Sequence, residues 1–366
     1  MTGMHVIFAP DSFGGTLTAV EAAEAMAEGW RRRSPDDELE LAPMSDGGPG
    51  FVDVLHACLG GELLSVPVLD LYGDETPTAV LMVEDTAYVE SAQGCGLHLS
   101  ERRNPERATT YGVGQMIAAA VEDGASRVVV GLGGSGTNDA GAGLLAALGA
   151  TSTPPEALAG GPQALEMLSG VDVTAPRQRC ADVELVIASD VDNPLLGLRG
   201  ATNVFGPQKG VVEERKHYIE AQVQRLAELT DRRLADEPGA GAAGGLGFAL
   251  LLLGATRVGG IGVVAEAVGL AARARNSDLV VTGEGAFDFS SRSGKVPYGV
   301  AQIAAEAIRP CIALAGQVLV GSREMRALGI ESAYSVVDLV GEQAAFADPA
   351  VSLAALAERV ARTWSR

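Results

Sequence analysis

Short apolar runs alternate with amphipathic helical patterns at both ends of the chain. At the start, the run HVIFAP is followed by a polar loop and by apolar residues at helical spacing after Thr18, the expected N-cap. At the end, the apolar runs in SDLVVTGEG, CIALAGQ and SAYSVVDL are separated by helical patterns around 300–307 and 323–328. Strands separated by helices predict a parallel sheet of βα units, and both chain ends together can complete one doubly wound sheet.

The middle of the chain has a different pattern. Short strands such as TAVLMVE and TAYVES are typical of a mixed sheet, RVVVG and VELVIAS predict buried strands, and 213–233 predicts a long helix. The glycine-rich stretch EPGAGAAGGLG predicts a loop that opens onto a buried helix. We therefore predict an α/β fold of two domains: a doubly wound, mostly parallel domain from residues 1–65 and 276–366, and an inserted α/β domain with a mixed sheet from 66–275.

Composition narrows the class of protein. The 366 residues are 47% hydrophobic, which is enough to bury two cores, and the formal net charge of −20 argues against nucleic acid or an anionic membrane as a partner. The four cysteines form no CxxC and the four histidines have no ligand spacing, so neither zinc nor disulfides are expected. No apolar run approaches the ~20 residues of a membrane span. We expect a cytoplasmic protein that acts on small molecules, and a homo-oligomer is compatible with the sequence.

Lysine is rare in this chain and stands at selected places. Only three of the 27 Lys and Arg residues are lysines. Lys209 in FGPQKG and Lys295 in SGKVP lie in glycine-flanked loops, whereas Lys216 in EERKHY has the setting of an ordinary surface lysine. An ammonium group is a compact point charge that suits a phosphate or carboxylate at short distance. Both loop lysines are therefore candidates for binding an anion.

The segment GLGGSG at 131–136 follows a predicted strand and matches the dinucleotide-binding pattern G-x-G-x-x-G. It is the basis of one hypothesis, an NAD-dependent dehydrogenase, which is weakened because the acidic residue expected about 20 positions on would be Glu156, in a proline-rich loop. The following residues would present polar groups at the N-terminus of a predicted helix, where anions bind well. The alternative is that Asn138 or Asp139 only caps that helix. The binding candidates here are Gly133, Gly134, Ser135, Thr137, Asn138 and Asp139.

Further carboxylates follow predicted strands. Asp190 and Asp192 in SDVDNPL would lie on the same side of an extended segment, in which Pro194 forces Asn193 to be extended. Two neighbouring carboxylates can bind a metal ion or raise the pKa of one of them. The alternative is an Asx-turn before the proline.

The remaining candidates lie in loops that directly follow predicted strands of the doubly wound sheet. Glu284 and Asp288 in TGEGAFD could hold Mg²⁺, which prefers one or two carboxylates together with phosphate oxygens, and Lys295 could then balance phosphate charge. In a parallel sheet the loops after the first two strands share the same edge, which would bring Asp11, Ser12 and Asp46 to the same cleft. The alternative for each is a turn-forming residue or an exposed acidic turn.

The ordered motifs APDSFGGTLTA, PMSDGGPG, GLGGSGTNDAGAG, SDVDNPLLG, FGPQKG, PGAGAAGGLG and TGEGAFDFSSRSGKVPYGVA resemble those of the glycerate kinase family, which phosphorylates D-glycerate with ATP. The resemblance implies two α/β domains with the active site in the cleft between them, MgATP as donor, and 2-phosphoglycerate, or alternatively 3-phosphoglycerate, as product. On this hypothesis Lys209 and Lys295 neutralise charge and Asp190 accepts the hydroxyl proton. The metal ligands would come from Asp192, Glu284 and Asp288.

The chain departs from the family's pattern at three positions. The family usually has SFKG, DGGEG and GEGR where this chain has Gly14, Pro49 and Ala286. Loss of a cation beside a carboxylate substrate costs about 1.5 to 3 kcal/mol, or roughly 10- to 150-fold in affinity. Either another group such as Arg292 substitutes, or the acceptor differs, or the chain is a non-catalytic relative that binds glycerate or ATP.

Overall fold

The structure is a computed structural model that describes residues 3–101, 103–288 and 295–365. The chain forms two compact units. Unit 1 comprises Met1–Asp46, Asp53–Gly60 and Ile261–Arg366, and unit 2 comprises Gly47–Val52 and Gly61–Gly260. Both chain ends therefore contribute to unit 1, and unit 2 is inserted between them.

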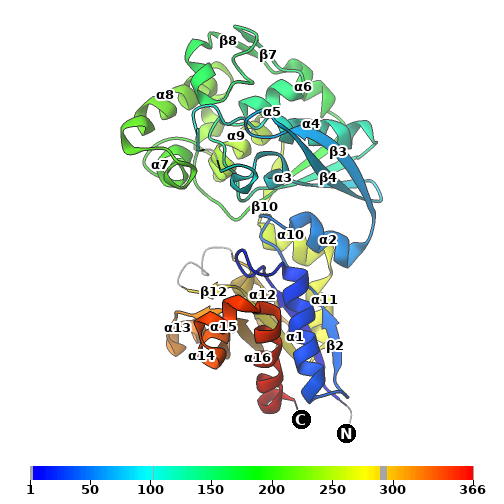
Figure 1. Cartoon of the computed structure of the whole chain (residues 1–366). Coiled ribbons are helices and arrows are strands. Elements are labelled where there is room, and N and C mark those ends of the chain that lie inside the picture. Colours follow the sequence, from blue (N-terminus) through cyan, green and yellow to red (C-terminus); the bar gives the residue numbers. More distant parts are fainter. Residues whose placement is uncertain (1–2, 102, 289–294, 366) are drawn as a thin grey trace. The chain divides into compact units, whose positions relative to one another are not determined.

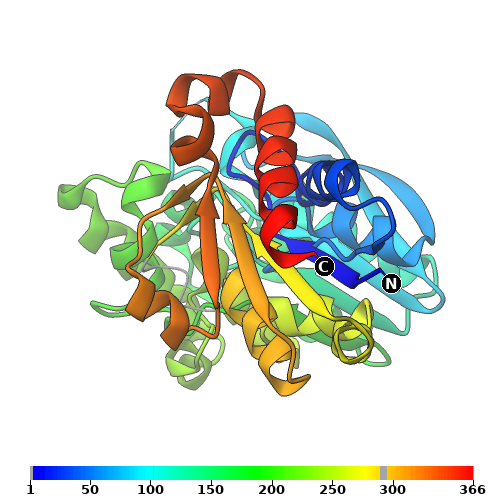
Figure 2. The ribbon, with the colours of Figure 1, turned by 90° about the horizontal axis from the view of Figure 1, so that it is seen from below.

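Unit 1 is built on a five-stranded parallel sheet with the strand order β15-β13-β11-β1-β2. Figure 2 shows α1 and α16 on one face of this sheet and α11 and α12 on the other. The sheet is therefore doubly wound, as predicted. Its strands are β1 (His5–Pro10), β2 (Glu38–Leu41), β11 (Leu279–Gly283), β13 (Cys311–Ala315) and β15 (Ser332–Ser335), and β12 (Ala286–Phe287) pairs separately with β14 (Gln317–Val318).

The helices of this part of the chain are short except for α1 and α16 (Figure 1). They are α1 (Ala19–Arg33), α2 (Phe51–Leu59), α10 (Gly260–Ala267), α11 (Leu270–Asn276), α12 (Val296–Glu306), α13 (Ser322–Ala327), α14 (Val336–Val340), α15 (Glu342–Ala347) and α16 (Pro349–Trp364).

Local sequence explains why α1 begins where it does. Thr18 caps the helix as predicted: its side chain accepts a hydrogen bond from the backbone N–H of Glu21, and the Glu21 side chain accepts one from the Thr18 backbone. The buried face of α1 carries Trp30, whose ring meets that of Phe8 in β1 edge to face at a centroid distance of 5.8 Å. These contacts fix α1 on the sheet.

Unit 2 contains a six-stranded mixed sheet with the order β10-β9-β6-β5-β4-β3, in which β3, β4 and β5 form an antiparallel meander and the other pairs are parallel. The strands are β3 (Glu62–Leu69), β4 (Glu75–Val83), β5 (Thr86–Glu90), β6 (Arg127–Gly131), β9 (Glu184–Ala188) and β10 (Thr256–Val258), with a separate hairpin of β7 (Thr151–Thr153) and β8 (Gly170–Asp172).

The helical elements of unit 2 are α3 (Ser91–Cys95), η1 (Leu97–Leu99), α4 (Tyr111–Glu122), α5 (Ala142–Ala147), η2 (Pro162–Met167), α6 (Thr174–Arg179), α7 (Ala201–Phe205), η3 (Pro207–Lys209), α8 (Glu213–Leu229), η4 (Arg232–Asp236), η5 (Ala242–Gly244) and α9 (Leu246–Leu252).

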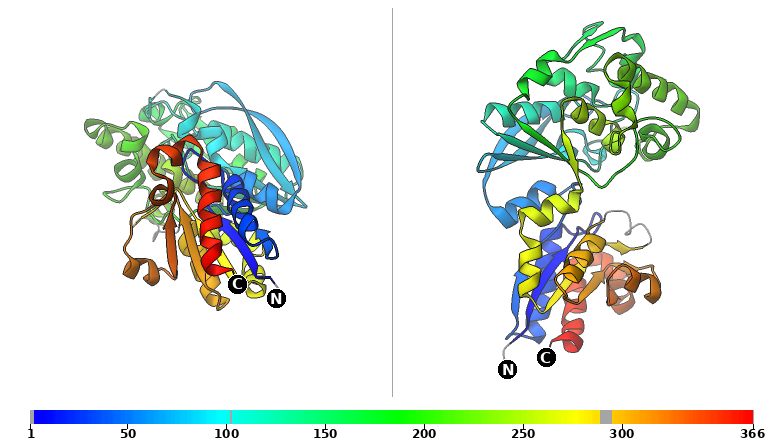
Figure 3. Two further views of the ribbon diagram at one scale, coloured as in Figure 1. Left: turned by 60° about the horizontal axis from the view of Figure 1, so that its bottom comes forward. Right: turned by 180° about the vertical axis from the view of Figure 1, so that it is seen from behind.

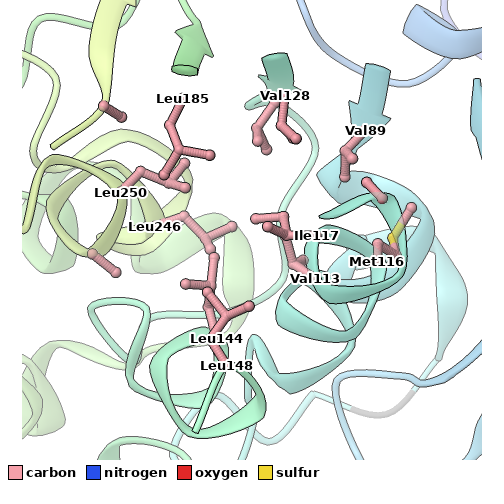
Figure 4. Packing of buried hydrophobic residues seen from close by; sticks show 14 of the residues in the cluster. Val89, Val113, Met116, Ile117, Val128, Leu144, Leu148, Leu185, Leu246 and Leu250 are labelled. Atoms are coloured by element: carbon pink, nitrogen blue, oxygen red, sulfur yellow. The ribbon is translucent and has the colours of Figure 1, made fainter. Parts of the chain in front are cut away.

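The main core of unit 2 lies between its sheet and the helices α4, α5 and α9 (Figure 4). Val113 and Ile117 of α4, Leu144 of α5 and Leu246 of α9 are fully buried in one cluster with Val128 of β6. Burial of each such side chain stabilises the fold by about 1.5 to 3 kcal/mol. The glycine-rich stretch before α9 does open onto a buried helix, as the sequence predicted.

The compact units differ from the predicted domains 1–65, 66–275 and 276–366 in three stretches. Gly47–Val52 belongs to unit 2. Residues 61–65 belong to unit 2, because β3 begins at Glu62 and pairs along its length with β4. Residues 261–275 belong to unit 1, because α11 packs on β1 and α12 (Figure 3). Neither α10 nor α11 was expected from the sequence. In the part of the chain that the structure describes, no helix combines the length and apolar character needed to cross a membrane.

Candidate functional site

Three acidic residues of unit 1 follow strands at the carboxyl end of its parallel sheet. Asp11 follows β1 and Glu284 follows β11, whose last residues, Pro10 and Gly283, are partners in the strand register. The Asp11 N–H donates to the Gly283 carbonyl at 2.8 Å, and Met44 N–H donates to the Pro10 carbonyl at 2.9 Å, two residues before Asp46. We call Asp11, Asp46 and Glu284 the acidic cluster.

The acidic cluster changes the proton affinity of Asp11. Burial, followed by the charge of Asp46, raises the pKa of Asp11 to about 7, against hydrogen bonding from Ser12 and with a smaller contribution from Glu284. The Ser12 N–H donates to the Asp11 carboxylate at 2.7 Å. The sequence predicted that these loops would share an edge, and the structure brings Asp11, Ser12, Asp46 and Glu284 together.

Lys295 lies beside this cluster. Its Nζ is 3.7 Å from a carboxylate oxygen of Glu284, which is 5% exposed, and Lys295 is also the residue that precedes the first turn of α12. Asp288, half-buried, follows β12 directly. Arg292 lies outside the described residues. The structure therefore places Lys295 beside Glu284, and its role in balancing phosphate charge stays a prediction.

A second group forms within unit 2 around Lys209. This side chain is 2% exposed, and its Nζ donates to the Thr137 carbonyl at 2.6 Å and to Ser135 Oγ at 3.4 Å. An ammonium group has three N–H donors, and these two acceptors leave one for a further partner. We call Lys209, Ser135 and Thr137 the lysine site.

Burial also changes the protonation of the lysine site. It lowers the pKa of Lys209 to about 8, against the charges of Cys95 and Asp139, and it raises the pKa of the Cys95 thiol to about 12. At neutral pH Lys209 therefore remains an ammonium ion and Cys95 a neutral thiol. A buried ammonium with few partners favours the binding of an anion.

Gly244 makes room for the Lys209 ammonium. It has φ +74°, and a Cβ at this position would lie 1.9 Å from the Thr137 carbonyl oxygen and 2.9 Å from Lys209 Nζ. Only glycine fits such a site without displacing the backbone. The glycine-rich stretch before α9 is therefore part of the lysine site, a role that its sequence alone did not indicate.

Asp139 has a structural role in this structure. One carboxylate oxygen accepts from the N–H of Gly141, and the other accepts from the Gly143 N–H and from both the N–H and Oγ1 of Thr110. These bonds satisfy backbone donors at the starts of α4 and α5. Burial raises the pKa of Asp139 in spite of them. The capping alternative thus describes this residue, and ligand binding by it stays a prediction.

Asn138 is fully buried beside it. Its Nδ2 donates to Thr202 Oγ1 at 2.9 Å, whereas Oδ1 has no hydrogen-bond partner in the described part of the chain. The amide oxygen is therefore available to a donor such as a hydroxyl group.

The structure corrects the prediction that GLGGSG opens a helix. The next helix, α5, begins only at Ala142, and the segment instead runs past neighbouring loops: Gly136 N–H donates to the Cys95 carbonyl, and a Cβ at Gly133 would meet Gly48. A dinucleotide site requires the glycines at a helix N-terminus. This segment has the strand and the glycines of the pattern but no helix that begins at them. The dehydrogenase hypothesis therefore loses its structural basis.

The SDVDNPL segment is assigned to no helix or strand, and its side chains have separate surroundings. Asp190 is half-buried, with Oδ1 2.7 Å from a Cβ built on Gly259, while Asp192 forms an ion pair with Arg257 at 2.7 Å. Asn193 Nδ2 donates to the Arg199 carbonyl at 2.7 Å within its own loop. The pairing with Arg257 competes with metal binding by Asp192.

Comparison with known proteins identifies the family. The profile described as the glycerate kinase family matches residues 6–365. Glycerate kinase of Bacillus subtilis is 40% identical over 345 residues, which cover 91% of this chain and 90% of the relative. Glycerate 2-kinase of Escherichia coli K12 is 36% identical over 349 residues, 92% of each. The chain belongs to the glycerate kinase family.

A solved structure agrees with this assignment. The crystal structure of a Salmonella typhimurium LT2 protein, provisionally named glycerate kinase 2, superposes with a TM-score of 0.84 at 35% identity and covers 98% of both chains. The two-unit α/β fold is thus the family's fold, and membership makes this chain a kinase. That the acidic cluster and the lysine site serve one cleft stays a prediction.

One departure from the glycerate kinase pattern has a visible packing role. Pro49 lies against Gly134: a Cβ on that glycine, which has φ +64°, would be 2.8 Å from the proline Cγ. The nearby Glu90, 5% exposed, accepts from the N–H groups of Gly50 and Val52 at 3.1 and 3.2 Å. The Glu90 carboxylate therefore holds the loop that contains Pro49 and the start of α2.

Sequence reasoning missed Thr110, Gly244 and Cys95 as parts of these groups. A glycine run offered a signal for Gly244, and Thr110 could have been found as the residue before a helical pattern. Cys95 gave no signal, because only the folded chain brings its sulfur to Lys209.

Proposed function

We propose that the protein transfers the γ-phosphoryl group of ATP to a hydroxyl of D-glycerate, with 2-phosphoglycerate and ADP as products. The observation that carries this proposal is the family match over residues 6–365, to which the E. coli relative described as a glycerate 2-kinase adds the choice of hydroxyl. The buried cation of the lysine site and the acidic cluster supply chemistry that the reaction needs.

The acidic cluster fits a magnesium–phosphate group. Mg²⁺ binds through one or two carboxylates together with phosphate oxygens, and it would supply charge neutralisation for the transferred phosphoryl group. Among the described residues no group of three or more His, Cys, Asp or Glu side chains is placed to hold a metal ion, so the protein would supply at most two ligands. The fit rests on the positions of Asp11 and Glu284, which each follow one of two paired parallel strands, with the Asp11 N–H donating to the Gly283 carbonyl at 2.8 Å. Asp11 and Glu284 would hold the ion, and Lys295, whose Nζ is 3.7 Å from Glu284, would meet a phosphate oxygen.

The lysine site supplies the acceptor's contacts in this proposal. Lys209 binds the glycerate carboxylate through its remaining N–H donor, and the free Oδ1 of Asn138 accepts from a glycerate hydroxyl. Asp190 takes the proton of the reacting glycerate hydroxyl. The oxygen of that hydroxyl forms the new bond to the γ-phosphorus as the bond from this phosphorus to ADP breaks. Asp192 and Asp288 remain candidates for the metal, with Asp192 having to leave Arg257.

A coupled assay of ADP release tests the proposal. D-glycerate, L-glycerate and related hydroxy acids are compared with ATP and Mg²⁺, and the phosphorylated carbon is identified by phosphorus and proton NMR. We expect turnover with D-glycerate and phosphate on the 2-hydroxyl. Phosphate on the 3-hydroxyl would correct the regiochemistry, binding of glycerate and ATP without ADP release would make the chain a non-catalytic relative, and tight NADH binding without ADP release would contradict the kinase assignment.

A further inference from the structure

A largely apolar pocket of about 250 Å³ lies in unit 1, close to the acidic cluster. Its walls come from the loop after β1, from the residues after β11 and β13, and from α14, α15 and the start of α16 (Figure 1). The lining residues are Phe13, Gly14, Thr16, Gly285, Ala286, Gly316, Gln317, Val336, Val337, Ala345, Phe346, Pro349 and Leu353, none of which is charged. The function proposed above gives this pocket no role.

The same two loops line the pocket and carry the acidic cluster. Asp11 and Phe13 are two residues apart, as are Glu284 and Ala286, so each loop places a carboxylate and a pocket wall within about 7 Å of chain. Ligands of open α/β sheets bind outside the carboxyl ends of the strands, where both features lie. One elongated ligand can therefore contact the pocket with one end and the carboxylates with the other.

The properties of the pocket fit an uncharged aromatic ring. Its volume lies below the ~300 to 1,000 Å³ that complete drug-sized ligands occupy, so it suits part of a larger molecule. Phe346 lines the pocket and is 60% exposed, so its ring is accessible to a stacking partner. Gln317 lines the same pocket and offers an amide donor and acceptor to the edge of a heterocycle.

Two of the positions at which the chain departs from its family's pattern face this pocket. Gly14 and Ala286 stand where the pattern has lysine and arginine, and both line the walls. A Cβ on Gly14 would have no neighbour within 4 Å, and Ala286 is exposed. In this chain the pocket is therefore open and without the two cations, which favours a neutral group over a phosphate.

We propose that this pocket binds the purine base of the phosphoryl donor, stacked on Phe346, while the triphosphate extends to the acidic cluster. The inference rests on the proposed function, since it assumes a nucleotide as donor. It goes further by assigning the nucleotide to unit 1 and by naming Phe346, Gln317 and Ala286 as the residues that contact the base.

Two variants separate base binding from phosphate binding. Phe346→Ala removes the stacking surface, and Ala286→Trp fills the pocket from an exposed position. Val351→Ala is the matched control, because Val351 is 56% exposed on α16 and does not line the pocket. Calorimetry measures the Kd of MgADP and of magnesium pyrophosphate, which has no base, and thermal unfolding verifies that each variant is folded.

We expect Phe346→Ala to weaken MgADP binding about tenfold, within the range known for loss of a base-stacking side chain, and Ala286→Trp to weaken it at least as much. The Kd of pyrophosphate and the behaviour of Val351→Ala should stay at the wild-type values. Unchanged MgADP affinity in both folded variants would overturn the inference, as would an equal loss of pyrophosphate affinity. If either of these results is found and the wild type still transfers phosphate from ATP, the proposed function stands and only the base site is wrong. A wild type that neither binds MgADP nor releases ADP would instead overturn both.

Discussion

Asp11 and Glu284 occupy equivalent places on neighbouring parallel strands, each one residue beyond the register pair Pro10 and Gly283. Extended β-structure brings two such residues within the distance of adjacent strands, about 4.8 Å apart in backbone terms. The fold thus places two carboxylate-bearing residues on adjacent strand ends, where their negative charges repel each other. Such an arrangement is costly unless a proton or a cation neutralises it.

This relationship predicts how stability depends on pH. The pKa of Asp11 is about 7 in the folded protein and 3.8 in the unfolded chain, so the folded state binds this proton more tightly. The resulting contribution to the free energy of unfolding is complete below pH 3.8 and is lost as the pH rises through 7. With metal removed by EDTA, Asp11→Asn should therefore gain stability relative to wild type, by a few kcal/mol at most, as pH rises from 5 to 8. Thermal unfolding of both proteins across this range measures the difference. A difference that does not change with pH would contradict the assignment to Asp11.

The lysine site predicts a basic limit to activity. Because the pKa of Lys209 is about 8, its ammonium charge is lost above that pH, and kcat/KM for glycerate should fall there. Lys209→Met should lower kcat/KM by roughly 10- to 150-fold at pH 7, the effect of one lost charge-assisted hydrogen bond, and should abolish this limb of the profile.

Lys216→Met is the matched control for that substitution. Lys216 pairs with Glu213 at 2.6 Å on α8 and takes no part in the lysine site, although its side chain is only 14% exposed and thus more buried than the predicted surface setting. Its variant should keep both the rate and the pH profile of the wild type. Equal losses in the two variants would show that Lys209 acts through general charge or stability and not through contact with a substrate.

Gly244 predicts a steric effect on the lysine site. Gly244→Ala places a methyl group 1.9 Å from the Thr137 carbonyl, in addition to the backbone cost of φ +74°. Gly254→Ala is its control, since Gly254 has φ +92° and a Cβ there would have no atom within 4 Å. We expect both to lower the melting temperature, with Gly244→Ala destabilising by about 1 to 3 kcal/mol more and also losing activity. Equal melting temperatures would mean that the site adapts to the methyl group.

Variants of Asp139 and Asp190 should distinguish a carboxylate that stabilises the fold from one that takes part in the reaction. Asp139→Ala leaves the N–H groups of Thr110, Gly141 and Gly143 without their acceptor, each at a cost of about 1 to 3 kcal/mol, so the melting temperature should fall steeply. Asp190→Asn should keep a near-native melting temperature and lose about 10²- to 10⁴-fold in kcat, as expected for loss of a general base. Calorimetry and single-turnover kinetics on the two variants measure both quantities. A folded, inactive Asp139→Ala would assign that carboxylate to the reaction.

The sequence was sufficient where a rule of sheet geometry applied. Asp11, Asp46 and Glu284 could be grouped in advance because loops after parallel strands share one edge, whatever their separation in sequence. The Thr18 cap was equally local and was confirmed by its hydrogen bonds. Both predictions used only strand ends and a helix cap, which are encoded in runs of a few residues.

Other features depended on packing that no local pattern records. GLGGSG satisfied its motif, yet the next helix begins only at Ala142, and Gly136 bonds instead to the Cys95 carbonyl. The burial of Lys209 requires Thr137 and Gly244 to meet it from distant parts of the chain. The assignment of residues 261–275 likewise depended on which surface α11 covers.

The central place of β1 between β2 and β11 has a consequence for synthesis on the ribosome. The partner strand β11 begins at Leu279, so β1 must wait until about 270 further residues have been synthesised before its sheet can close. Residues 61–260 contain every strand of their own sheet and should become protease-resistant earlier. Limited proteolysis of ribosome-bound chains halted at increasing lengths would reveal this order, and simultaneous protection of both units would contradict it.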